Sequence, residues 1–283
     1  MKKKRPEFRG LNLTYRSMLS VVKYFNKFNA EKFKNDKKSQ KFIYDEDYDL
    51  LKKFVDENAI KVRTLDVQIV DIADEIAYAA HDLEDGLRVK AFTIDEILHD
   101  YKAKYGETES YSVFEENVNE ARKKAGYGTN KIDSTQYSKL FRQELASRLI
   151  NLALNDIDLV PVTDDMRNKT NTMQTEELGF SKYEELIHGL KDIVFRCINH
   201  NDDVYHYEQQ GRKVIKFLKE LYSEERMYLP PEYRAKEIME QYEDLKDVDA
   251  NRLQDRLICD YIAGMMDSYA ISVYEKFSGQ KFM

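Results

Sequence analysis

The chain has 283 residues, of which 42% are hydrophobic and 34% charged, and Gly and Pro together number only 14. This length fits one large domain or two small ones, and the composition excludes a collagen-like, low-complexity or wholly disordered chain. No apolar run approaches the roughly 20 residues of a membrane span, and no apolar stretch follows the charged start Met1–Arg5, so we expect neither a membrane protein nor a secretory signal peptide. Cys197 and Cys259 are too few for a disulfide framework, which makes a reducing cytoplasm the simplest compartment.

The charge is unevenly distributed. Residues 1–43 contain 13 Lys or Arg against 3 Asp or Glu, so the remaining 240 residues carry the acidic excess behind the net charge of −7. A basic segment of this kind either meets polyphosphate or nucleic acid, or is a solvated arm. The aromatic residues that alternate with Lys between Tyr24 and Tyr44 favour a folded segment, because disordered tails contain few aromatics.

Helical periodicity and capping signals recur along the whole chain. The first three expected helices cover residues 14–28, 45–57 and 64–90. The capping box Thr93–Glu96 opens a fourth, and a fifth runs from Ser112 to Gly126. The remaining four cover residues 133–159, 181–199, 203–222 and 252–277. Residues 161–180 are expected to be a polar connection, and we predict neither a strand nor an internal repeat. The sequence therefore predicts an all-α, multi-helix fold.

The stretch Leu65–Arg88 is the most informative of these helices. At 100° per residue, the apolar residues cluster on one side of the helix and the polar residues on the other. The apolar side contains Leu65, Ile69, Ile72, Ile76, Leu83 and Leu87, and the polar side contains Asp71, Asp74, Tyr78, His81, Asp82 and Asp85. Asp74, Tyr78 and Asp82 form one line at i, i+4 and i+8, where like charges repel. The pattern fits a solvated acidic face, or a face on which a cation or a sugar phosphate relieves the repulsion.

Three motifs resemble segments of one protein family, and they occur along the chain in the same order as in that family. Gly10–Arg16 with Lys23-Tyr24 is similar to its "GLNLT…KYP" segment, Val70–Gly86 to "VDxADEIAYxxHDLEDG", and Asp260–Ala270 to "DYIAGMTDxYA". These are segments of the bacterial deoxyguanosinetriphosphate triphosphohydrolases. The resemblance covers nearly all of this chain and the C-terminal part of the family's chain. It implies an HD-superfamily-like helical domain over residues 1–283, with residues 1–160 contributing to the active site and residues 161–283 forming a C-terminal helical extension.

The resemblance also implies a reaction. The family are metal hydrolases that split a deoxynucleoside triphosphate into a deoxynucleoside and inorganic triphosphate. A His, a His-Asp pair and a later Asp hold the divalent metal, Mg, Mn or similar, and the later Asp falls on Asp74. Tyr78 and Asp82 match positions that contact the deoxyribose.

The family's phosphate-binding segments fall on Lys23, Tyr24 and Lys41. Arg256 resembles an Arg that reaches phosphate across a subunit boundary, although a surface ion pair on a helix explains it equally well.

The departures from the family pattern concern the metal ligands. The family's His and His-Asp segment precedes "GLNLT", whereas the nine residues before Gly10 include no His. The pairs His81-Asp82 and His99-Asp100 stand in the wrong order, and we interpret both as coincidences. Met266 replaces the usual Thr of "GMTD", which puts a local hydrogen bond in doubt.

One carboxylate does not make a catalytic metal site, so this chain alone is expected to be inactive. Three explanations are open: a companion chain supplies the HD segment, the chain is a fragment, or it is a degenerate relative. The complete line on Leu65–Arg88 favours the first two. We therefore expect a companion HD-bearing chain or segment, or a homo- or hetero-oligomer, and an apolar surface where that segment packs. The alternative function is an inactive helical module that binds nucleotide or single-stranded nucleic acid.

Overall fold

The structure is a computed structural model that describes residues 13–29, 31, 41–127, 133–199, 202–242, 245 and 248–282. The chain divides into two compact units, Met1–Ile198 and Asn199–Met283. Most of the basic segment, including Gly10 and residues 32–40, lies outside the described residues. No helix in the described ranges is both long and apolar enough to cross a bilayer.

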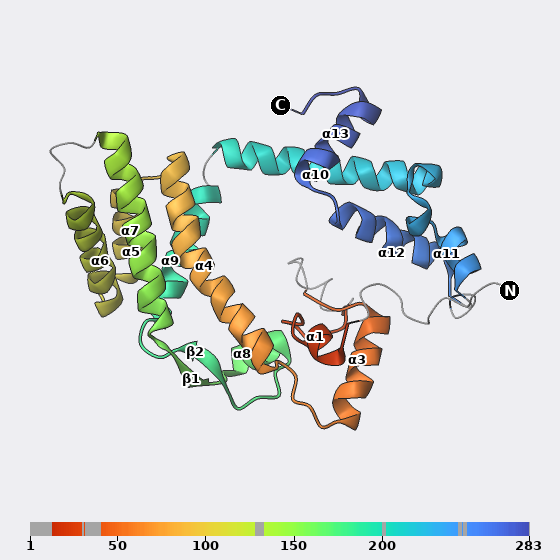
Figure 1. Ribbon diagram of the computed structural model, residues 1–283, viewed down its shortest axis with the longest axis horizontal. Helices are drawn as coiled ribbons and strands as arrows, with labels where there is room; N and C mark the ends of the chain where they lie inside the picture. The colour runs from red at the N-terminus through yellow and green to blue at the C-terminus, as the bar shows by residue number, and fades with distance from the viewer. Residues whose placement is uncertain are drawn as a thin grey trace. The chain divides into compact units, whose positions relative to one another are not determined.

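Helices dominate both units, as predicted (Figure 1). The first unit contains α1 (Tyr15–Leu19), α3 (Asp45–Glu57), α4 (Leu65–Val89), α5 (Ile94–Tyr105), α6 (Glu109–Ala125), α7 (Ser134–Leu154), β1 (Ile157–Pro161), α8 (Asp164–Thr170), β2 (Glu176–Phe180) and α9 (Glu184–Asn199). The second contains α10 (Asp202–Glu224), the 3₁₀ turns η2 (Arg226–Tyr228) and η3 (Pro231–Tyr233), α11 (Ala235–Gln241), α12 (Ala250–Ala263) and α13 (Asp267–Ser278).

The helix ends follow the local chemistry of the sequence. The capping box that opens α5 forms, because the Thr93 hydroxyl accepts from the Glu96 amide and the Glu96 carboxylate accepts from the Thr93 amide. Thr108 caps α6, so that helix begins three residues before the expected Ser112. Lys90 ends α4 in the left-handed conformation. The bounds of α3 agree with the prediction.

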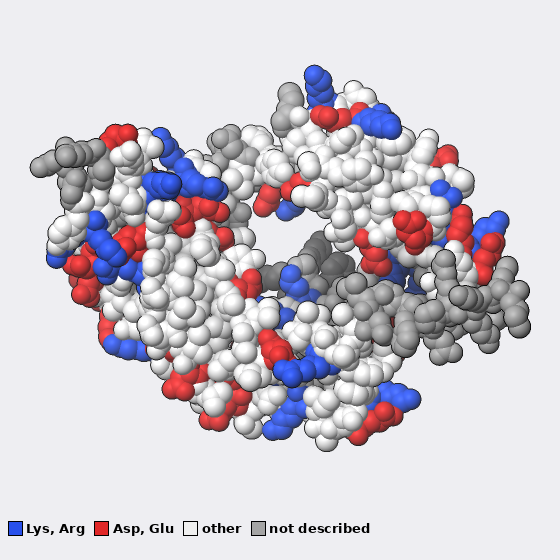
Figure 2. Space-filling model, in the orientation of Figure 1, with Lys and Arg blue, Asp and Glu red and all other residues white. Residues whose placement is uncertain are grey.

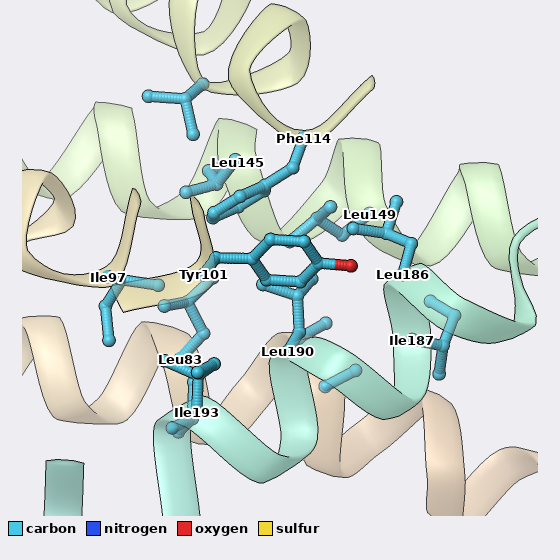
Figure 3. Packing of buried hydrophobic residues seen from close by; sticks show 14 of the residues in the cluster. Leu83, Ile97, Tyr101, Phe114, Leu145, Leu149, Leu186, Ile187, Leu190 and Ile193 are labelled. Atoms are coloured by element: carbon cyan, nitrogen blue, oxygen red, sulfur yellow. The ribbon is translucent and has the colours of Figure 1, made fainter. Parts of the chain in front are cut away.

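The core of the first unit lies between α4, α5, α6, α7 and α9. Its centre is Tyr101, whose ring is enclosed by Phe114, Leu145 and Leu190 (Figure 3). The Tyr101 hydroxyl donates to the Glu185 carbonyl at 3.2 Å, which satisfies its polar end. This core fixes α9 against α4 and so brings together Glu75 and Lys191, which are 116 positions apart in the sequence.

The expectation of no strand is wrong. β1 and β2 pair antiparallel, with Leu159 opposite Leu178, and α8 lies in the connection between them. Each strand is only five residues long, and the exposed Asp158 and the buried Glu177 give the segment a polar look in the sequence. The pairing also explains why α7 ends at Leu154 and does not continue to residue 159.

The expected helix over residues 14–28 is also wrong. α1 ends at Leu19, and the following residues are irregular because tertiary partners take their backbone groups: the Phe25 amide donates to the Thr170 carbonyl at 3.2 Å. Phe25 itself is buried with Leu51 and Val55 of α3. Tertiary contacts therefore override the apolar spacing.

The second unit has its own core, in which Leu218 and Tyr222 of α10 pack with Ile258 of α12 and Val273 of α13. The helix expected over residues 252–277 is two helices, because Gly264 ends α12 and Met266 begins α13. The two cores share no residue among those described.

Candidate functional site

The line predicted on α4 lies on one face of that helix. Tyr78 is 44% exposed and Asp82 is partly buried, while Ile72, Ile76 and Leu83 face the core. Leu65 and Ile69, which the periodicity places with these apolar residues, are instead 59% and 53% exposed. The helix thus has a buried side and an exposed side that is partly apolar.

A cavity of about 740 Å³ opens beside this face. It is lined by Lys23, Tyr24, Lys41, Asp74, Glu75, Tyr78, Asp82, His188, Lys191, Asp192 and Phe195. Six predicted site residues therefore border one cavity, although three of them come from the N-terminal segment and three from α4. The last four belong to α9.

Sequence reasoning missed Glu75 and the α9 residues. Lys191 donates to both carboxylate oxygens of Glu75, at 2.7 and 2.8 Å, and its ammonium lies 4.8 Å from the centroid of the Tyr78 ring. His188 Nε2 is 3.9 Å from the same carboxylate. Glu75 and Lys191 are 116 positions apart, so no local pattern links them. Their pairing arises from the packing of α9 on α4.

Lys23 is held by charged partners on α4. Its ammonium forms an ion pair with Asp71 and lies 3.9 Å from Asp74 Oδ2. Burial alone would lower the pKa of Lys23, but the hydrogen bond and the charge of Asp71 outweigh it and raise the pKa. Lys23 is therefore a cation at the cavity wall.

Asp71 in turn belongs to a buried network around Arg63. The Arg63 side chain is 1% exposed, and its Nη2 donates to Asp71 Oδ2 at 2.8 Å. Burial would raise the pKa of Asp71, but hydrogen bonds from Lys23 and Arg63 outweigh it, so the pKa is lowered. Asp71, predicted as part of the polar face, serves this network and does not line the cavity.

Asp82 has a different environment from Asp71. Burial, together with the negative charges of Asp85 and Asp74, raises its pKa above the usual carboxyl range. Two carboxyl groups on the polar face of α4, about three turns apart, therefore have pKa values shifted in opposite directions by different neighbours.

The residues present do not complete a metal site. Among the described residues, no group of three or more His, Cys, Asp or Glu side chains is placed to hold a metal ion. The Lys23 ammonium lies 3.9 Å from Asp74 Oδ2, and it is a cation and not a ligand. His81 and His99 face Glu84 and Asp100 respectively, and neither lines the cavity.

Arg256 lies in the second unit, on α12, with its Nε 3.6 Å from Asp260 Oδ2. This is the helix ion pair that the sequence leaves open as one explanation for Arg256. The motif Asp260–Ala270 spans the break between α12 and α13. There, the hydroxyls of Tyr261 and Tyr269 form a hydrogen bond of 3.3 Å, beside a cavity of about 300 Å³.

Comparisons with known proteins agree with the extent of the resemblance over this chain. Residues 180–276 match a family described as the phosphohydrolase-associated domain. The chain is 34% identical over 286 residues to the deoxyguanosinetriphosphate triphosphohydrolase-like protein 2 of Vibrio cholerae, covering 99% of this chain and 62% of the relative. A deoxyguanosinetriphosphate triphosphohydrolase-like protein of Thiobacillus denitrificans is 25% identical over 282 residues, covering 95% of this chain and 60% of the relative.

The chain therefore spans about three fifths of the length of these relatives. Similarity extends across both units, and the family model covers β2's last residue to α13. The resemblance indicated by the three motifs is thus confirmed: homologues named as deoxyguanosinetriphosphate triphosphohydrolase-like proteins align with 95% to 99% of this chain, and residues 180–276 contain the phosphohydrolase-associated domain.

Proposed function

We propose that the chain forms much of the substrate site of a metal-dependent deoxynucleoside triphosphate triphosphohydrolase, which releases inorganic triphosphate. The observation that carries this proposal is the cavity in which Lys23 and Lys41 of the N-terminal segment meet Asp74, Tyr78 and Asp82 of α4. The fit to a nucleotide is chemical. Ammonium groups suit a polyanion, and a partly buried carboxyl suits a sugar hydroxyl.

Each residue then has a proposed role. Asp82 accepts a hydrogen bond from the deoxyribose hydroxyl, and Tyr78 packs against the sugar. Lys23, Tyr24 and Lys41 bind the phosphates. Lys191, which Glu75 holds over the Tyr78 ring, adds a third ammonium to the same wall. We also propose that Arg256 contacts a phosphate across a subunit boundary.

We propose Asp74 as one ligand of the divalent metal, with the remaining ligands supplied by an HD-bearing segment, in a companion chain or elsewhere in a longer one. The exposed apolar residues of α4 support this arrangement. Leu65, Ile69 and Val70, in the first two turns of α4, are 59%, 53% and 60% exposed, and Val70 lies one turn before Asp74 on the same face. On the face in Figure 2, few acidic or basic side chains cover the middle of α4. An apolar strip beside an incomplete ligand set suits a packed partner.

The decisive experiment is reconstitution of this chain with an HD-bearing segment from a relative, followed by measurement of inorganic triphosphate released from deoxynucleoside triphosphates. We expect turnover by the pair and none by the chain alone. Asp74→Ala should abolish both metal retention and turnover while leaving the helical circular dichroism unchanged. Asp85→Ala is the matched control, because Asp85 lies on the same helix but pairs with Arg88 outside the cavity.

Two outcomes would contradict the proposal. If Asp74→Ala keeps its metal and its turnover, Asp74 is not a ligand. If the reconstituted pair binds deoxynucleoside triphosphate but releases no triphosphate, the chain is a binding module, and titration with single-stranded nucleic acid then tests the alternative function.

A further inference from the structure

Arg63 occupies an unusual position for a permanently charged side chain. It stands in the turn before α4 with a left-handed φ of 60°, and its side chain is 1% exposed. Its carbonyl accepts hydrogen bonds from Gln68 at 3.0 Å and from Gln174 at 3.3 Å. A buried guanidinium is costly unless every part of it is paired, so its partners indicate what it is for.

The guanidinium is paired on all sides. Nε donates to both oxygens of Glu177, at 3.1 and 2.8 Å, and the Glu177 side chain is also 1% exposed. Nη1 donates to the backbone carbonyl of Lys23 at 3.1 Å, and Nη2 donates to Asp71. Glu177 anchors the guanidinium, which leaves the two Nη groups directed at Lys23 and its ion-pair partner.

Arg63 therefore holds Lys23 at both ends. It contacts the Lys23 carbonyl directly, and it fixes Asp71, whose other oxygen pairs with the Lys23 ammonium. Lys23 sits in the irregular segment after α1, and a lysine has four freely rotating stem bonds, so without this grip its ammonium would be disordered. A cation that is already ordered loses less conformational entropy when a ligand binds.

We propose that Arg63 and Asp71 are positioning residues that hold the Lys23 ammonium at the cavity wall for an anionic ligand. The identity of that ligand as a triphosphate rests on the proposed function. The positioning itself does not, because it concerns the chain without ligand.

The first experiment needs no ligand. The rate at which an amine-acylating reagent modifies Lys23 is measured by peptide mass spectrometry, with Lys61 of the same chain as the internal reference. Arg63→Lys conserves the charge but cannot reach Glu177, Asp71 and the Lys23 carbonyl together, so Lys23 should be acylated about threefold to tenfold faster. Arg167→Lys is the matched control, since Arg167 donates to the Thr172 and Gln174 carbonyls of the neighbouring loop and does not contact Lys23.

The second experiment is a double-mutant cycle for binding of inorganic tripolyphosphate by the whole chain. Arg63→Lys should weaken binding about threefold to tenfold when Lys23 is present and have no further effect in a Lys23→Ala background. The effect of Lys23 should shrink at high salt. If Arg63→Lys does not fold by circular dichroism, Asp71→Asn replaces it. Asp71→Asn keeps an acceptor for Arg63 but removes the ion pair, and its effect on acylation and binding must likewise vanish without Lys23.

The outcomes separate the two proposals. Unchanged acylation of Lys23 in the Arg63 and Asp71 variants overturns the positioning role, as does an effect on binding that persists in the Lys23→Ala background. Faster acylation with no tripolyphosphate binding by the unaltered chain keeps the positioning role and contradicts the triphosphate site.

Discussion

At the scale of single residues, the carboxyl groups of α4 differ because their neighbours differ. Arg63 and Lys23 lower the pKa of Asp71, whereas burial and the charges of Asp85 and Asp74 raise the pKa of Asp82. The raised pKa means that the folded chain binds the Asp82 proton more tightly than the unfolded chain does. Ionisation of Asp82 therefore lowers the free energy of unfolding as the pH rises through the folded-state pKa. Below the pKa of the unfolded chain, Asp82 is protonated in both states and the effect is absent.

Asp82→Asn should accordingly change stability and binding in opposite directions. At neutral pH, we expect a modest rise in thermal midpoint, which disappears under acidic conditions where Asp82 is protonated in both states. Affinity for deoxynucleosides should fall by roughly 1–3 kcal/mol, because a neutral amide is a weaker acceptor for the sugar hydroxyl than a carboxylate. Scanning calorimetry at both pH values and equilibrium binding measure these effects.

Asp66→Asn serves as the control for binding, since Asp66 lies on the same helix, pairs with Arg16 and does not line the cavity. A lower midpoint for Asp82→Asn at neutral pH would contradict the electrostatic argument, and unchanged deoxynucleoside affinity would remove Asp82 from the sugar site.

At the scale of elements, α4 depends on a close contact at its C-terminal end. A Cβ on Gly86 would lie 2.1 Å from Cζ of Phe92, a ring that is only 7% exposed. Gly86→Ala gains about 1 kcal/mol of helix propensity but loses about 1–3 kcal/mol to overpacking, so we expect net destabilisation of up to about 2 kcal/mol. Denaturant unfolding of the first unit measures the change.

Gly211→Ala in α10 is the corresponding control, because a Cβ there meets no atom within 4 Å. It should stabilise the second unit by about 0.5–1 kcal/mol. If Gly86→Ala proves as stabilising as Gly211→Ala, the Phe92 ring moves aside freely and the contact does not constrain α4.

At the scale of the whole molecule, the separate cores predict separate folding. All buried residues around Tyr101 come from the first unit, and those around Leu218 come from the second. Residues 1–198 expressed alone should therefore keep their helical circular dichroism and melt in one cooperative transition. A fragment that lacks such a transition would show that the second unit is needed for the first to fold.

The exposed strip on α4 predicts association. We expect the chain to purify with an HD-bearing partner or as a homo-oligomer, because Leu65, Ile69 and Val70 together present an apolar surface. The double variant Ile69→Lys with Val70→Lys should reduce association measured by light scattering, while Val89→Lys, at the end of the same helix and 66% exposed, should not. A monodisperse single chain of 33.5 kDa would contradict the prediction.

Much of this protein follows from its sequence alone. Apolar spacing predicts the bounds of α3 and α4 almost to the residue, and the capping box predicts the start of α5, because these signals act within one or two turns of a helix. The line Asp74, Tyr78 and Asp82 is equally local, since three residues at i, i+4 and i+8 must share a face. The three motifs that carry the family resemblance are read directly from the chain.

Only the tertiary structure decided the rest, because it depends on contacts between distant segments. Residues 14–28 have helical spacing, but bonds to α8 and Arg63 hold residues 20–26 in an irregular path. The β1–β2 pair has strands too short to signal themselves, and it brings Glu177 to Arg63 across 114 positions. Lys191 reaches Glu75 only because a shared core fixes α9 on α4, so the four cavity-wall residues of α9 lie outside what local patterns can specify.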